Sequence, residues 1–294
     1  MLSILIPTYN YNVLPMVEQL HRQADSLGII YEIIIFDDAS PDAVAKAENE
    51  KINSLAYCKY EVLPKNIGRS AIRNLLAKTA KFDWLLFLDA DTIPATDCLI
   101  KNYLPHLNGT DKIVYGGIKY QEDKPKADKL LRWEYGNERE AIPAEDRNKT
   151  PYLSLLTLNF AVKKSIFDKV KFNETIPNLR HEDTLFSYDL KQENVVVEHI
   201  DNNVYHLGLD TSTIFIEKSK EAVVGLKYLL DNKLLEKDYI RIAKVYYTLK
   251  KWRLNGVAAY LYTVSKNTLK KNFTSTHPSM FLFDIYRLCY LCTL

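Results

Sequence analysis

Cysteine, net charge and long apolar runs are all scarce in this sequence of 294 residues. Its four cysteines, Cys58, Cys98, Cys289 and Cys292, are too few and too scattered for a disulfide framework, which favours a reducing cytoplasm. A net charge of +2 gives no bulk electrostatic reason to expect a nucleic-acid partner. No uncharged apolar run approaches the roughly eighteen residues of a membrane span, and the first residues lack the basic start of a secretory leader. We therefore expect a cytoplasmic protein.

Motifs of two other protein classes are also missing. The sequence has no G-x-G-x-x-G, which argues against a dinucleotide-dependent dehydrogenase. Cys289 and Cys292 have no second Cys or His pair nearby, although a zinc site needs about four ligands. We therefore expect these two cysteines to pack as small apolar residues. The hydrophobic share of 47% is ordinary, so the chain can bury a core of normal size.

Strand and helix patterns alternate over the first part of the chain. The apolar runs expected to form strands covered on both faces are 2–7, 31–36, 56–63 and 84–88. Helices are expected between them, one capped by Asn12, one capped by Ser40 with Pro41 in its first turn, and one over 69–80. Strands separated by helices of this length imply right-handed crossovers and a mainly parallel sheet. The sequence therefore predicts a Rossmann-like α/β half over residues 1–110.

The pattern is less regular further along the chain. The expected elements are strands at 113–118, 154–162, 195–199 and 204–207, helices at 129–140 and 183–191, and a helical region from 212. Residues 111–210 would complete the α/β domain as its acceptor half. Residues 211–294 would form a helical C-terminal extension.

The chemically informative residues follow the predicted strands. Ligands of an open parallel sheet bind beyond the carboxyl ends of its strands. Asp37 and Asp38 end one strand, and two adjacent carboxylates repel each other unless each has a partner. After another strand, Asp89 and Asp91 project to the same side of an extended segment, so both can face one hard cation. Asp-x-Asp also occurs in ordinary loops, but its place at a strand end favours a cation that would neutralise a diphosphate leaving group.

Five segments in this order resemble glycosyltransferase family 2, and the resemblance covers residues 1–210. The segments are Ser3-Ile4-Leu5-Ile6-Pro7-Thr8-Tyr9-Asn10, Phe36-Asp37-Asp38-Ala39-Ser40, Asn66-Ile67-Gly68-Arg69-Ser70-Ala71-Ile72-Arg73-Asn74, Phe87-Leu88-Asp89-Ala90-Asp91 and Leu179-Arg180-His181-Glu182-Asp183-Thr184. The resemblance implies a GT-A fold, an α/β architecture with a Rossmann-like, mainly parallel sheet and helices on both faces. It also implies an inverting transferase that moves a sugar from a nucleotide diphosphate sugar to a hydroxyl of a glycan or lipid-linked glycan acceptor.

The resemblance assigns a donor site. Tyr9 would stack on the base, and Asp38 would accept a hydrogen bond from it, which suits the N3–H of uracil and favours a UDP-sugar. Gly68 would allow close backbone approach, and Arg73 would lie near the base or the acidic pair, with a surface arginine as the alternative. Asp89 would contact the ribose or a metal-bound water. The remaining donor residues would be Pro7, Thr8 and Asn10.

The resemblance also assigns residues for metal binding and for proton transfer. Asp91, with Asp89, would hold Mn²⁺ or Mg²⁺. His206 lies where relatives place a histidine near the metal, with a hydrogen-bonded strand-end histidine as the alternative. Asp183 would be the general base that takes the acceptor proton, with Glu182 orienting base or acceptor. Without the upstream motifs, the dipole of a helix starting there would explain both carboxylates.

Acceptor contacts are expected from two further residues. Trp133 can stack on a sugar ring, with core packing as the alternative, and Asn159 ends the predicted strand 154–162 and would face the acceptor. Family members that polymerise sugars carry Gln-x-x-Arg-Trp and membrane spans. This sequence has neither, which favours single additions.

Two rival functions use similar sheets. A non-catalytic nucleotide-sugar-binding domain would lose acids at the metal or base positions, but Asp89, Asp91, Glu182 and Asp183 are all present. A sugar-nucleotide pyrophosphorylase would need a Gly-rich basic loop directly after the first strand, and this sequence has none there. Catalytic sugar transfer is therefore favoured over both rivals.

The C-terminal segment 280–292 is apolar over most of a helix surface but too short and too charged to span a bilayer. Basic residues that could meet anionic head groups lie upstream, namely Lys250, Lys251, Arg253, Lys266, Lys270 and Lys271. The helix is therefore expected either to lie in a membrane interface or to pack on the protein body or on a second copy.

Overall fold

The computed structural model describes all 294 residues, and the chain divides into two compact units. The α/β unit consists of residues 1–120, 141–175 and 182–208. The helical unit consists of residues 121–140, 176–181 and 209–294. The helix expected at 129–140 thus belongs to the helical unit and not to the α/β half, because its Leu131 is part of the helical core.

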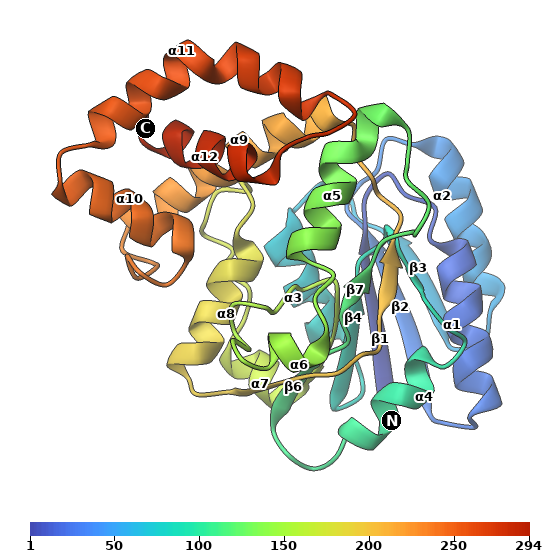
Figure 1. Cartoon of the computed structure of the whole chain (residues 1–294). Coiled ribbons are helices and arrows are strands. Elements are labelled where there is room, and N and C mark those ends of the chain that lie inside the picture. Colours follow the sequence, from blue (N-terminus) through green and yellow to red (C-terminus); the bar gives the residue numbers. More distant parts are fainter. The chain divides into compact units, whose positions relative to one another are not determined.

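A seven-stranded sheet in the order β3-β2-β1-β4-β8-β6-β9 forms the centre of the α/β unit (Figure 1). Its strands are β1 (Leu2–Thr8), β2 (Tyr31–Asp37), β3 (Cys58–Val62), β4 (Trp84–Leu88), β6 (Lys112–Tyr115), β8 (Asn159–Lys163) and β9 (Val196–His199). The first four run parallel to one another, as do β6 and β9, whereas β8 is antiparallel to both of its neighbours. The predicted mainly parallel α/β sheet is confirmed.

Helices cover both faces of this sheet, which is why its central strands are apolar on both sides. Leu20 of α1 and Tyr103 of α4 belong to the core of one face. The other face has an aromatic core under α3, α7 and α8, in which Phe87 stacks on Phe160 with ring centroids 5.0 Å apart. The helices of the unit are α1 (Leu14–Ser26), α2 (Ala43–Glu50), η1 (Lys51–Ser54), α3 (Arg69–Thr79), α4 (Leu99–Tyr103), η2 (Leu104–His106), α6 (Ala144–Arg147), α7 (Lys164–Lys169) and α8 (Glu182–Gln192).

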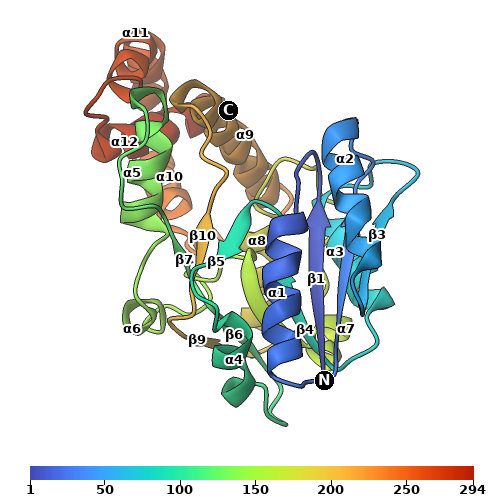
Figure 2. The ribbon, with the colours of Figure 1, turned by 90° about the vertical axis from the view of Figure 1, so that its right-hand side faces the viewer.

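A second, three-stranded sheet lies next to the strand ends of the first and is visible in Figure 2. It consists of β5 (Thr92–Pro94), β10 (Val204–His206) and β7 (Ile118–Lys119). β10 pairs antiparallel with β5, and this register places His206 opposite Thr92. Because Thr92 directly follows Asp91, the small sheet brings residues from distant parts of the sequence to one place.

The start of α2 differs from the expectation. Asp42, and not Ser40, caps this helix, since its carboxylate accepts hydrogen bonds from the backbone N–H groups of Val44 and Ala45. The hydroxyl of Ser40 accepts instead from the backbone N–H of Asn10, at 2.7 Å. Ser40 therefore ties the loop after β1 to the loop after β2.

The helical unit has its own apolar core, formed by Leu131, Ile216, Phe273, Met280, Phe283 and Tyr286. Its helices are η3 (Ala127–Lys129), α5 (Leu130–Arg139), α9 (Ser212–Asp231), α10 (Arg241–Lys251), α11 (Asn255–Phe273) and α12 (Met280–Leu291). Of the alternatives for the C-terminal segment, the structure supports packing, because Met280, Phe283 and Tyr286 of α12 belong to this core, although Phe281 is 71% exposed. No helix is both long and apolar enough to cross a bilayer.

Replacing Phe160 by Ala should lower the free energy of unfolding by about 3–5 kcal/mol, because the ring is fully buried between sheet and helices. Val44→Ala, at a side chain that is 75% exposed on α2, is the matched control and should change it by about 0.5 kcal/mol or less. Urea denaturation followed by circular dichroism measures both. Equal effects of the two substitutions would contradict the assigned core.

Candidate active site

The loop after β1 carries the first group of predicted donor residues. The ring of Tyr9 is 51% exposed, so its face is free to stack on a base, whereas Thr8 is buried and Pro7 half-buried. Asn10 has a left-handed backbone with φ of 52°, and its side-chain oxygen accepts from the backbone N–H of Asp42. The turn is therefore fixed by its neighbours while the aromatic ring stays accessible.

The two adjacent carboxylates after β2 have separate donors, which resolves their repulsion. Asp37 is buried and accepts from the hydroxyl of Tyr60 and the backbone N–H of Ser40, both at 2.7 Å. Asp38 accepts from the backbone N–H groups of Ile67 and Gly68, at 2.6 and 3.0 Å. A carboxylate has about four acceptor positions. Asp38 can therefore hold the 66–68 loop and still accept one bond from a ligand.

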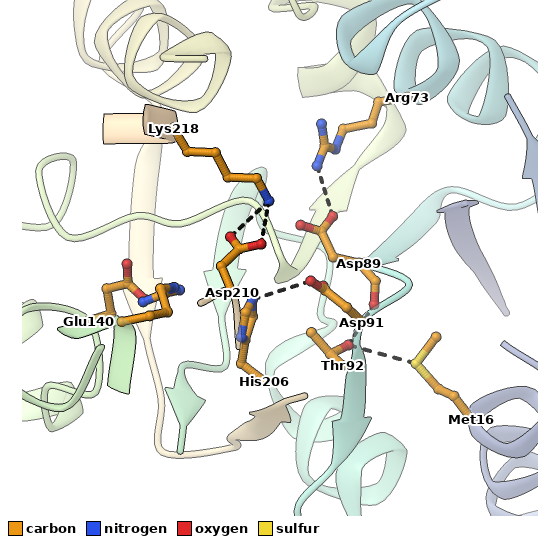
Figure 3. Close-up of polar contacts among 10 residues, drawn as sticks. Met16, Arg73, Asp89, Asp91, Thr92, Glu140, His206, Asp210 and Lys218 are labelled. Carbon is orange, nitrogen blue, oxygen red and sulfur yellow. Dashed lines mark hydrogen bonds and ion pairs between the residues drawn. The ribbon is translucent and has the colours of Figure 1, made fainter. Parts of the chain in front are cut away.

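Arg73 is the central cation of the site and is not a surface residue. Its side chain is buried, and its Nη2 donates to Asp89 Oδ1 at 2.8 Å (Figure 3). Its Nη1 lies 3.7 Å from Glu182 Oε1. The guanidinium also lies 5.3 Å from the centre of the Phe172 ring, and its Nε has no hydrogen-bond partner. Burial opposes the charge, but Asp89 and Glu182 outweigh it and raise the pKa of Arg73. Arg73 thus joins the end of β4 to the start of α8.

The predicted base lies in the first turn of α8. Asp183 accepts a hydrogen bond from the backbone N–H of Thr184 at 2.7 Å. Burial, followed by the neighbouring charge of Glu182, raises its pKa from 3.8 to about 6. The two residues before this turn, Arg180 and His181, both have left-handed backbones, with φ of 70° and 68°. A carboxylate with a pKa near the working pH is suited to general base catalysis.

Asp91 and His206 form a second polar pair, with His206 Nε2 3.3 Å from Asp91 Oδ2 (Figure 3). The backbone adds a second link, because Leu207 N–H donates to the carbonyl of Asp91 at 2.8 Å. The ring nitrogen Nδ1 of His206 is buried without a partner. No three His, Cys, Asp or Glu side chains lie together as a ready metal cluster, and Asp89 pairs with Arg73. The predicted metal residues are therefore divided between two neighbouring contacts.

The two predicted acceptor residues, Asn159 and Trp133, have different surroundings in the structure. Asn159 is fully buried, and its amide donates to the carbonyls of Gly117 and Asn202 and accepts from the hydroxyl of Tyr103. Its side chain is fully used in joining strands, so the predicted acceptor contact is wrong. Trp133 lies on α5 of the helical unit and donates its indole N–H to the carbonyl of Gln121, so its acceptor role stays a prediction.

Three site residues had no individual prediction. Arg69 lies 3.8 Å from Glu182, and the Asn66 amide donates to the carbonyl of Asp38 at 3.0 Å. A Cβ on Gly208 would lie 2.3 Å from Asp91 Oδ2, so a side chain at this position would displace the carboxylate. The sequence signals were the 66–74 segment for the first two residues and the glycine two places after His206 for the third.

The chain is similar in sequence to known glycosyltransferases. Residues 3–170 match the glycosyl transferase family 2 model, and the chain belongs to this family. It is a glycosyltransferase with the GT-A fold. An uncharacterized glycosyltransferase of Haemophilus influenzae is 24% identical over 251 residues, which cover 78% of this chain and 92% of that protein. Chondroitin synthase of Escherichia coli is 30% identical over 127 residues, 42% of this chain and 18% of that protein.

Solved structures give the same fold. The mannosyltransferase PcManGT from Pyrobaculum calidifontis, in complex with GDP-Man and Mn²⁺, has a TM-score of 0.55 at 13% identity and covers 78% of this chain. TarS 1–349 of S. aureus in complex with UDP-GlcNAc has a TM-score of 0.50 at 17% identity and covers 76%. The chain matches 64% and 66% of the lengths of these two structures.

The raised pKa of Asp183 makes stability depend on pH. The pKa of Asp183 is near 3.8 in the unfolded chain and about 6 in the folded protein, so the folded state binds more protons between these two pH values. The ionised Asp183 carboxylate does not destabilise the fold below the pKa of the unfolded state. Its destabilising effect grows as the pH rises and is complete above the pKa of the folded state. Asp183→Asn should therefore stabilise the protein at pH 8 by about 1–3 kcal/mol and have little effect at acidic pH.

Thermal unfolding at pH 8 and at pH 4 measures this difference. The control is Asp83→Asn, at an exposed carboxylate of the same unit, which should change stability little at either pH. A variant no more stable than the wild type at pH 8 would show that Asp183 is not held in an unfavourable ionised state.

Proposed function

We propose that the protein is an inverting glycosyltransferase that moves a sugar from UDP to a hydroxyl of a glycan or lipid-linked glycan. The Arg73 bridge is the observation that carries the proposal. It ties Asp89, which follows a strand end where nucleotides bind in open sheets, to the carboxylate pair that contains Asp183. Donor-side and acceptor-side acids are thereby held by one buried cation.

The proposed chemistry is a single in-line displacement. The acceptor oxygen attacks C1 of the sugar, Asp183 takes the hydroxyl proton, and the bond from C1 to the diphosphate breaks with its electron pair leaving on the diphosphate. A base placed on the face opposite the leaving group gives inversion at C1, as attack from the far side does in inverting glycosidases. Glu182, held by Arg69 and Arg73, keeps the first turn of α8 in position.

The residues present fit a divalent metal bound together with the donor. Asp91 offers a carboxylate, and His206 offers an imidazole from the opposite strand. Sites of this kind use one or two carboxylates and take their remaining ligands from substrate phosphates and water. When bound, Mn²⁺ or Mg²⁺ would neutralise the charge that develops on the departing diphosphate. Mn²⁺ suits the mixed oxygen and nitrogen donors better than Mg²⁺.

UDP is proposed over GDP because the base site has one exposed ring, Tyr9, and one acid, Asp38. The neighbours contain both kinds of donor, since TarS is solved with UDP and UDP-GlcNAc and PcManGT with GDP-Man. Of the two acceptor positions of Asp38 that remain, one can receive the N3–H of uracil.

Calorimetric titration of UDP and GDP in Mn²⁺ tests the donor site. UDP should bind more tightly than GDP, and excess EDTA or Asp91→Asn should weaken UDP binding at least about tenfold, equivalent to about 1.4 kcal/mol. Asp83→Asn is the control and should bind like the wild type. Tighter binding of GDP than of UDP would overturn the proposed preference for uracil. Equal binding of UDP with and without EDTA would overturn the proposed metal requirement.

Transfer assays with a panel of UDP-sugars, Mn²⁺ and candidate acceptors test the chemistry. Asp183→Asn should lower turnover by a factor on the order of 10² to 10⁴ and leave UDP affinity nearly unchanged, because the base acts on the acceptor. Asp189→Asn is the matched control, since it neutralises another carboxylate of α8 whose pKa is also raised to about 6. Nuclear magnetic resonance of the product should show the inverted anomer.

A retained anomer, or full turnover in Asp183→Asn, would reassign this carboxylate to capping α8. Donor binding without turnover on any acceptor or water would favour a non-catalytic nucleotide-sugar-binding domain instead.

A further inference from the structure

One face of α11 is apolar although it is exposed. Val257, Tyr260, Leu261 and Val264 recur at the i, i+3, i+4, i+7 spacing of a helix face, and each is between 50% and 67% exposed. The opposite face of the same helix enters the core of the helical unit through Phe273, and Tyr262 and Leu269 pack against that core. The helix is thus apolar on both sides, and the core accounts for only one of them.

The turn before α11 extends this exposed surface. Trp252 and Leu254 are 69% and 41% exposed. Between them Arg253 has a left-handed backbone with φ of 60°, which ends α10 and turns the chain into α11. We define these two residues and the four of α11 as the α11 surface. A bulky aromatic residue at a charged turn, beside an apolar helix face, is unusual for a surface that meets only water.

The chain around the α11 surface is strongly basic. Residues 239–283 contain no Asp or Glu, and their Lys and Arg residues are Arg241, Lys244, Lys250, Lys251, Arg253, Lys266, Lys270 and Lys271. With a total charge of +2 for the whole protein, these eight charges leave the remaining chain at −6. Of the eight, Lys270 forms an ion pair, with Glu217 at 3.0 Å. The positive charge is therefore concentrated in the segment of the chain that carries the exposed apolar face.

We propose that the α11 surface docks on the surface of an anionic lipid bilayer. Aliphatic side chains would enter the boundary between head groups and acyl chains, while Trp252 and Tyr260 suit the interface because they have an apolar body and a polar edge. Lys and Arg at both ends of the stripe can extend their charges to anionic head groups. α11 would lie flat in the interface.

A bilayer fits this surface better than a second copy of the chain. A twofold contact through α11 would bring the same eight positive charges of each copy together, and no acid in this segment compensates them. The proposed membrane surface lies on α11 and not on α12, the helix considered from the sequence, because Met280, Phe283 and Tyr286 of α12 pack in the core. The proposal does not depend on the sugar donor, the acceptor or the catalytic base.

Vesicle flotation of the full-length protein tests the proposal. The protein should float with vesicles of phosphatidylcholine and phosphatidylserine and much less with phosphatidylcholine alone, and added salt should weaken the binding because it screens the charges. The triple variant Val257→Ser, Leu261→Ser, Val264→Ser should lose at least about tenfold in lipid affinity. Its turnover on a soluble acceptor and its thermal stability should stay those of the wild type.

The matched control replaces three aliphatic residues of the α/β unit that are at least as exposed, Ile30→Ser, Val44→Ser and Val196→Ser. This control should float like the wild type. Absence of flotation, equal flotation of the α11 variant, or equal binding to neutral vesicles would overturn the proposal. A wild type that sediments as a dimer and an α11 variant that sediments as a monomer would also overturn it, in favour of self-association.

Discussion

The buried guanidinium of Arg73 is the constraint on which the rest of the site depends. A cation inside a protein is strongly unfavourable unless it is paired, and here its partners come from the end of β4 and the start of α8. The same side chain lies over Phe172, whose ring stacks on Phe186 of α8 at 4.3 Å. The aromatic core therefore supports Arg73, and Arg73 holds the acidic residues that would otherwise repel one another.

Backbone N–H groups hold Asp38 at the end of β2, as Arg73 holds Asp89 and Glu182. Asp38 binds the N–H groups of the 66–68 loop, which leads directly into α3, and α3 carries Arg73. Gly68 makes this loop possible, because its φ of 85° is a left-handed conformation that a side chain would strain. The 66–68 loop and the first turn of α8 are thus connected through α3 and Arg73.

The helical unit contains two apolar helices that play different parts in the structure. α11 and α12 are both rich in apolar residues, but Met280, Phe283 and Tyr286 of α12 pack in the core, whereas α11 keeps one apolar face exposed within a basic segment of the chain. Packing one apolar helix removes its surface from water and leaves the other available. A transferase whose acceptor is linked to a lipid would gain from that exposed face, because docking would concentrate the enzyme where its acceptor lies.

The sequence alone determined the strands from Leu2–Thr8 to Trp84–Leu88 and the acids that follow them, because uninterrupted apolar runs and the residues at their ends are local properties of the chain. Only the tertiary structure decided that Arg73 is buried and that Asn159 is a strand connector, and it supplied the contact with Asp91 for His206, which the family resemblance had implied to lie near the metal. These outcomes depend on pairings between distant segments, such as the antiparallel register of β5 and β10, which no local pattern encodes. The side of α11 that faces water was decided in the same way, since both of its faces are apolar and packing selected one.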